Sequence, residues 1–122
     1  MSQHVPPPSE ALSRRLLRTV PYKDRLAAGR LMPPVGMLRE DVCSLRELHL
    51  LLAPDVRSLP GLNLRVLADW VERVIGDREL ADALRKATQN AGSYVDGCLK
   101  VYELVGLRLK QAREVAGQEV LK

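Results

Sequence analysis

The feature that most constrains the fold is an apolar heptad pattern that runs without a break through residues 93–117. No proline interrupts it, and such a pattern is typical of a helix that packs along other helices. A helix of this length spans roughly 35 Å, so several shorter helices are needed to cover it. The heptad positions are Val95, Cys98, Tyr102, Val105, Leu109, Ala112 and Ala116.

The composition favours helices throughout the chain. Its 122 residues suffice for one hydrophobic core, and 46% of them are apolar although phenylalanine is absent. Leucine and alanine, mixed with arginine and glutamate, favour helix over strand. Because no stretch alternates β-branched and polar residues, we predict an all-α fold.

Capping residues predict where the helices of this bundle begin and end. Ser44 and Glu47 form a capping box before a helix that ends at Pro54. Asn63 caps a helix over residues 64–75, which Gly76 ends, and another helix starts at residue 77. Together with the long C-terminal helix, these segments predict about four body helices.

The first 36 residues differ from the rest in charge and in proline content. We interpret them as a basic, partly helical N-terminal arm (residues 1–36) joined at Pro33, Pro34 and Gly36 to a bundle domain (residues 37–122). Short helices are expected over residues 9–20 and 22–31. The basic pI, about 9.4, arises in this arm, which contains the candidate anion-binding and nucleic-acid-binding residues Arg14, Arg15, Arg18, Arg25 and Arg30. Docking on an acidic protein and lying on an anionic membrane are the alternatives for this segment.

No catalytic, metal-binding or cofactor-binding motif is present in the sequence. Cys43 and Cys98 form no close pair, and His4 and His49 do not join them at a metal-ligand spacing. We therefore expect buried thiols and predict a protein that is not an enzyme. The alternatives are a redox pair of the two cysteines and an enzyme whose site is assembled at an oligomer interface. With no apolar run of membrane-spanning length and no signal-peptide core, we predict a cytoplasmic protein.

Several residues admit two interpretations from the sequence alone. Trp70 is either a partly buried core residue or an exposed interaction anchor, and His49 is expected to be solvent-facing or hydrogen-bonded rather than a base. Gly97 and Gly106, inside the long helix, indicate either a close neighbour or a tolerant surface. The dense carboxylates of residues 69–82 alternate with arginines, which predicts surface ion pairs.

Residues 44–48 (SLREL), 68–71 (ADWV) and 76–81 (GDRELA) resemble an uncharacterised family of small helical domains. Members of that family occur alone or joined to carbohydrate-active enzymes. The resemblance covers about residues 42–84 and implies a helical fold, without an activity.

The functional prediction rests on the long helix, because its apolar face is larger than the area that the three short helices before it can cover. We predict a small interaction or assembly protein that self-associates through this helix, most simply as a twofold dimer, or that binds a protein partner. The alternative is a nucleic-acid-binding accessory protein that uses residues 9–30. The candidate interface residues are Val95, Tyr102, Val105, Leu109 and Ala112.

Overall fold

A computed structural model describes residues 5–120, with side chains through residue 117. It shows a mixed fold, so the all-α prediction is wrong: a three-stranded antiparallel sheet accompanies five α-helices in the described residues. The elements are α1 (Glu10–Leu17), η1 (Tyr22–Asp24), β1 (Gly29–Met32), β2 (Gly36–Arg39), α2 (Leu45–Leu52), β3 (Leu59–Gly61), α3 (Leu64–Trp70), η2 (Val71–Ile75), α4 (Arg78–Gln89) and α5 (Tyr94–Val120).

The short strands of the sheet explain why the sequence analysis predicted no strands. Its strands, in the order β2-β1-β3, are only three or four residues long, too short for an alternating pattern to stand out. The prolines that we interpreted as a joint form the hairpin turn between β1 and β2. Gly36 closes this turn with a φ of 106°, a conformation that glycine adopts readily. The helix predicted over residues 22–31 is limited to the short 3₁₀ helix η1.

The predicted helix starts in the body are confirmed by their capping bonds. The Ser44 hydroxyl accepts a hydrogen bond from the Glu47 amide at 3.0 Å, while the Glu47 carboxylate accepts from the Cys43 amide at 3.2 Å. The side chains of Asn63 and Asp77 likewise accept hydrogen bonds from backbone amides in the first turns of α3 and α4. Helix α3 continues directly into the π-helical turns of η2, which end at the left-handed Gly76.

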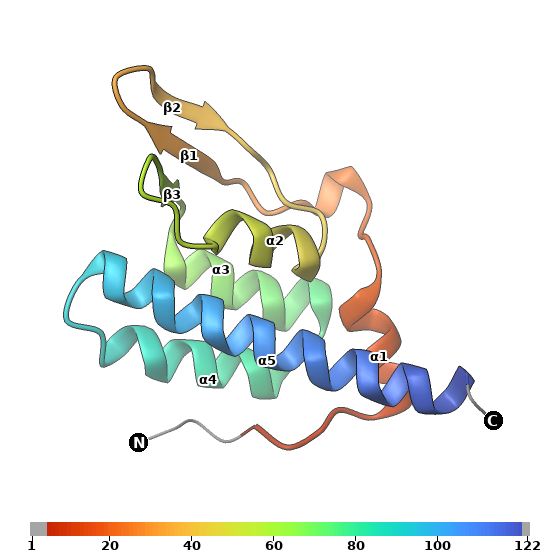
Figure 1. The fold of residues 1–122 in the computed structure, drawn as a ribbon. Helices are drawn as coiled ribbons and strands as arrows, with labels where there is room; N and C mark the ends of the chain where they lie inside the picture. Colours follow the sequence, from red (N-terminus) through yellow and green to blue (C-terminus); the bar gives the residue numbers. More distant parts are fainter. Residues whose placement is uncertain (1–4, 121–122) are drawn as a thin grey trace.

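Helix α5 is the central element of the fold (Figure 1). It lies across α4 and α2, with α1 against its C-terminal half and the sheet beyond α2. Its core face is buried against these helices, and together with α3 they place apolar residues of all five α-helices in one cluster. The buried residues of the described part of α5 are Gly97, Cys98, Val101, Leu104, Val105, Arg108, Leu109 and Ala112.

The first 36 residues pack with the rest of the chain. Val5, Leu16, Val20 and Leu26 belong to the common core. Strand β1 pairs with β2 across the boundary that we predicted after Gly36, so hydrogen bonds of the sheet cross that boundary. Within the described residues, no helix combines the length and the apolar character needed to cross a membrane.

Candidate interaction surface

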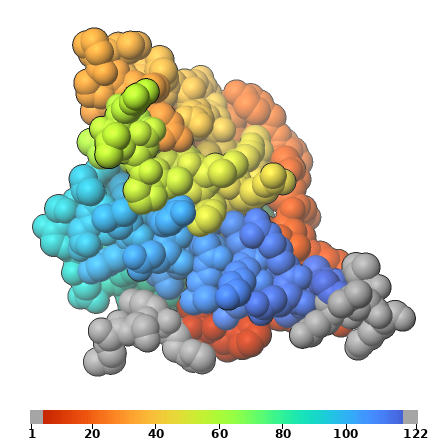
Figure 2. All heavy atoms as spheres, viewed as in Figure 1, coloured from red at the N-terminus to blue at the C-terminus, as the bar shows by residue number. Residues whose placement is uncertain are grey.

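An apolar cavity of about 190 Å³ lies where the end of α2 and the loop to β3 meet the first turns of α5. The same face is turned toward the reader in Figure 2, where the yellow-green loop residues border the light-blue start of α5. The cavity is walled by α2 and loop residues on one side and by Val95, Cys98 and Leu99 of α5 on the other. The other lining residues are Leu52, Ala53, Pro54, Asp55, Ser58, Leu59, Pro60 and Tyr94.

Exposed apolar side chains surround this cavity. Val56, in the loop that forms one wall, has a relative exposure of 102%. Val95 and Leu99 on α5 are 47% and 39% exposed, and Leu59 on β3 is 42% exposed. Large apolar groups gathered around an apolar cavity are typical of an interaction site.

The loop is held in place by polar contacts, so the cavity has a defined wall. Asp55 accepts hydrogen bonds from the Arg57 amide at 2.8 Å and the Ser58 hydroxyl at 3.2 Å. On the other side, the Tyr94 hydroxyl donates to the Pro60 carbonyl at 2.5 Å and accepts from the Leu62 amide at 3.2 Å. Burial raises the pKa of Tyr94 to about 12, which keeps the phenol neutral as a donor.

The heptad residues proposed as an interface are divided between the core and the surface. Val105, Leu109 and Ala112 are at most 1% exposed and pack inside the protomer. Tyr102 is half-buried, and Val95 is exposed beside the cavity. The apolar periodicity predicted a helix, and the structure contains it. The same periodicity does not distinguish residues that pack inside the chain from residues that contact a partner.

His49 lies farther along the seam between α2 and α5. Its ring stacks on Tyr102 with a centroid distance of 4.5 Å and an interplanar angle of 1°. Burial, followed by the nearby charge of Arg113, lowers the pKa of His49. Within the described part of the chain, these contacts of His49 include no carboxylate that would orient its ring as a general base.

The basic residues of the N-terminal segment are largely engaged within the chain. Arg25 pairs with Asp41 at 3.2 Å, and Arg30 pairs with Glu40 at 2.9 Å. The Arg15 guanidinium lies 3.5 Å from the Gly76 carbonyl. Arg14, on α1, and Arg18, directly after the end of α1, are exposed. Nucleic-acid binding through this segment stays a prediction. Fewer of its arginines are available for phosphate contacts than the sequence indicated.

The remaining ambiguous residues have structural positions. Trp70 is 4% exposed, and its indole nitrogen donates to the Asp24 carbonyl at 2.7 Å, so it is a core residue. Gly97 lies against a side chain of α3, with Leu64 at 3.0 Å from the position of an added Cβ. Cys98 is buried, Cys43 is half-buried, and both are free thiols. His4 lies outside the described residues.

A wider, more polar cavity of about 750 Å³ lies between α3, α4 and the start of α5. The Arg85 cation on its wall is already paired, because Arg85 binds Asp69 at 2.8 Å, Glu72 at 2.7 Å and Asp82 at 3.1 Å. These bonds raise the pKa of Arg85 further above its ordinary value. Among the described residues, no cluster of three potential metal ligands is present.

Comparisons with known proteins add no relative to this description. No family model matches the chain, and neither a curated protein nor a solved structure shows significant similarity to it.

Proposed function

We propose that this chain is a non-enzymatic assembly protein that forms a twofold homodimer through the face that carries the apolar cavity. The observation that supports the proposal is the position of a fully exposed Val56 in the loop that walls the cavity. A projecting side chain and a cavity on the same face make that face self-complementary. A twofold interface has this property, because each copy presents both halves of the contact.

In the proposed dimer, Val56 of each copy enters the cavity of the other. Removing a valine side chain from water contributes about 1.5–3 kcal/mol, and the contact occurs twice. Val95, Leu99 and Leu59 at the rim would lose their exposed area in the same step. The contact therefore uses the start of α5, including Val95, rather than the buried part of the heptad seam.

The charges beside Val56 suit the same arrangement. Asp55 precedes it and Arg57 follows it; the described residues show no salt bridge of the Arg57 side chain, although, after the hydrogen bond from the Arg57 amide, its charge helps to lower the pKa of Asp55. When two copies of this loop meet around a twofold axis, Asp55 of one faces Arg57 of the other. Such complementarity chiefly fixes orientation and disfavours other partners.

The test is a light-scattering mass across a concentration series, for the natural chain and for Val56→Glu. The natural chain should approach twice 13.6 kDa, and Val56→Glu should stay monomeric because it would place a charge in an apolar cavity. Val35→Glu is the matched control, since Val35 is a 73% exposed valine in the hairpin turn, away from the cavity. A natural chain that remains monomeric at every concentration, or a dimer that Val56→Glu leaves intact, contradicts the proposal.

A further inference from the structure

A strip of side chains follows the seam between α2 and α5 beyond the apolar cavity. Ala53 lies beside Leu99 at the cavity and His49 lies beside Tyr102, so the two helices run in opposite directions. We call this surface the α2–α5 strip. It consists of Arg46, His49 and Leu50 from α2, and of Tyr102, Gly106, Lys110 and Arg113 from α5.

The middle of the strip is flat and aromatic. The His49 ring, already stacked on Tyr102, also lies directly over Gly106. A Cβ at Gly106 would be only 2.7 Å from the His49 Nε2 atom, so the ring occupies the space that a side chain would need. The glycine thus allows a shallow floor between the two helices.

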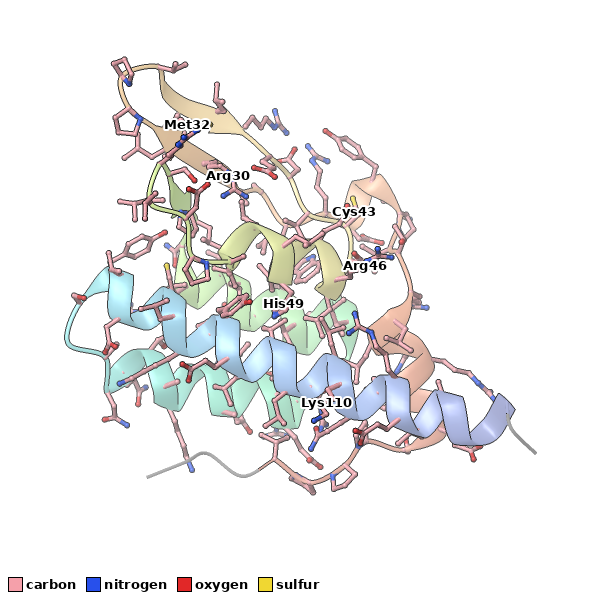
Figure 3. All side chains as sticks on the ribbon, viewed as in Figure 1. Arg30, Met32, Cys43, Arg46, His49 and Lys110 are labelled. Carbon is pink, nitrogen blue, oxygen red and sulfur yellow. The ribbon has the colours of Figure 1, made fainter. Side chains whose placement is uncertain are left out.

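One end of the strip is cationic. Arg46 precedes His49 by one helical turn, while Lys110 and Arg113 follow Gly106 by one and two turns, so all three border the same floor. Figure 3 shows Arg46 and His49 on α2 and Lys110 on α5, on the side facing the reader. The three cations are exposed and, within the described residues, form no ion pair. By contrast, Arg25, Arg30 and Arg85 are bonded to carboxylates.

An apolar anchor point accompanies these charges. Leu50 is 62% exposed and lies one turn after Arg46 on the same side of α2. Tyr102 on α5, which stacks on the adjacent His49, is half-buried. A ligand on the strip therefore meets a large apolar side chain, an aromatic floor and three unneutralised cations in sequence.

We infer that the α2–α5 strip docks an acidic amphipathic helix of another protein. The seam between two antiparallel helices accepts a third helix, which reads it through side chains at i, i+3, i+4 and i+7. Carboxylates on one stripe of that helix would complete the ion pairs that Arg46, Lys110 and Arg113 lack. An apolar side chain on the same stripe would cover Leu50.

The acids beside the strip favour this partner over a nucleic acid. Glu47, Glu103 and Glu114 are exposed and directly adjoin Arg46, Tyr102 and Arg113 in the chain. A continuous row of nucleic-acid phosphates would lie near these carboxylates as well as near the cations, and the carboxylates would repel it. A helix can place its carboxylates opposite the cations alone, which is the selective arrangement.

This inference goes beyond self-association and rests on other residues, so either proposal can fail alone. The probe is a fluorescein-labelled peptide of about four helical turns, with glutamates at i, i+4 and i+7 and a leucine at i+3. Its partner peptide has glutamine in place of every glutamate. Fluorescence anisotropy at low and high salt should show binding of the glutamate peptide that weakens with salt.

The variants identify the surface that binds. Arg46→Glu and Arg113→Glu should each weaken binding about fivefold, as expected for exposed charge pairs. The matched control is Lys86→Glu, an equal charge change at an exposed position of α4 that has no ion pair in the described residues. Circular dichroism checks that each variant is folded.

Three results would overturn the inference. The first is equal binding of the glutamine peptide, which would remove the role of charge. The second is equal weakening by Lys86→Glu, which would make the attraction a property of net charge. The third is tighter binding of a single-stranded oligonucleotide that Arg46→Glu and Arg113→Glu abolish, which would assign the strip to nucleic acid.

Discussion

Arg108 of α5 and Asp77 at the start of α4 form an ion pair from which water is excluded. Their atoms Nε and Oδ2 are 2.7 Å apart, Nη2 and Oδ1 are 3.2 Å apart, and each side chain is only 1% exposed. The same guanidinium donates to the Pro6 carbonyl, and Gln111 donates to the Val5 carbonyl at 2.9 Å. One buried charge thereby connects the N-terminal segment, α4 and α5.

Asp77→Asn should destabilise the fold strongly, because it leaves the buried Arg108 charge without its counterion. The expected loss is about 3–5 kcal/mol in the free energy of unfolding. It is measured by urea denaturation followed by circular dichroism. The amide retains an oxygen that can accept from the Leu80 amide, as Asp77 does at 3.0 Å, so the loss reports mainly on the ion pair.

Glu79→Gln is the control for this variant. Glu79 lies 3.9 Å from the same guanidinium, but its side chain is 60% exposed. Its removal should change the free energy of unfolding by less than about 1 kcal/mol. Equal effects of the two variants would contradict the assignment of Asp77 as the essential partner of Arg108.

The ion pair also marks a limit of what the sequence could predict. The capping role of Asp77 follows from local spacing, and so do the starts of α2 and α3 at Ser44 and Asn63. Its burial against Arg108, 31 positions later, depends on tertiary packing. In the sequence, Arg108 appears as one more charge on a long helix.

The sheet and the candidate surface were hidden for a similar reason. Strand β3 contains Pro60 and Gly61, which in isolation indicate a turn, and it becomes a strand only by pairing with β1. The cavity joins residues near position 54 with residues near position 95, so no local pattern encodes it. Val56 carried no signal at all, because a single valine in a loop is ordinary.

His49 should make stability depend on pH in a range where few other groups titrate. Its pKa is lowered from 6.5 by burial and by Arg113, with Arg46 as the nearest cation on its own helix. The unfolded chain therefore binds a proton more readily than the folded chain. The contribution to stability is complete above pH 6.5 and is lost as the pH falls from that value through the lower pKa of the folded state.

The measurement for His49 is the difference in unfolding free energy between the natural chain and His49→Gln at several pH values. Below pH 6.5, the free energy of unfolding of the natural chain should fall relative to that of His49→Gln, because glutamine does not titrate. Carboxylates titrate in both proteins and cancel in the difference. A difference that is independent of pH would contradict the lowered pKa of His49.

Gly106→Ala should move the His49 ring without unfolding the protein. The added methyl group would be 2.7 Å from Nε2, and the ring at the end of its side chain can swing away. Losing the stack on Tyr102 costs about 0.5–1.5 kcal/mol, which the better helix propensity of alanine, about 1 kcal/mol, largely offsets. Since the ring becomes more solvated, its pKa should rise toward the ordinary value.

A proton NMR titration of the His49 ring measures this change directly. Gly117→Ala is the matched control on the same helix, because an added Cβ there meets no atom within 4 Å. The control should leave the His49 titration unchanged. An unaltered His49 pKa in Gly106→Ala would show that the ring does not depend on the space above the glycine.

The reciprocal form of the proposed dimer predicts that two defective variants rescue each other. Val56→Glu removes the projecting apolar side chain and leaves the cavity intact, whereas Val95→Trp places a bulky ring at the cavity of about 190 Å³ and leaves Val56 intact. Each variant alone has no intact contact and should be monomeric. In a mixture, Val56 of the Val95→Trp copy can enter the cavity of the Val56→Glu copy, so one of the two contacts is restored. Sedimentation velocity should therefore show a heavier species in the mixture alone, and a mixture that sediments like its components would exclude the reciprocal contact.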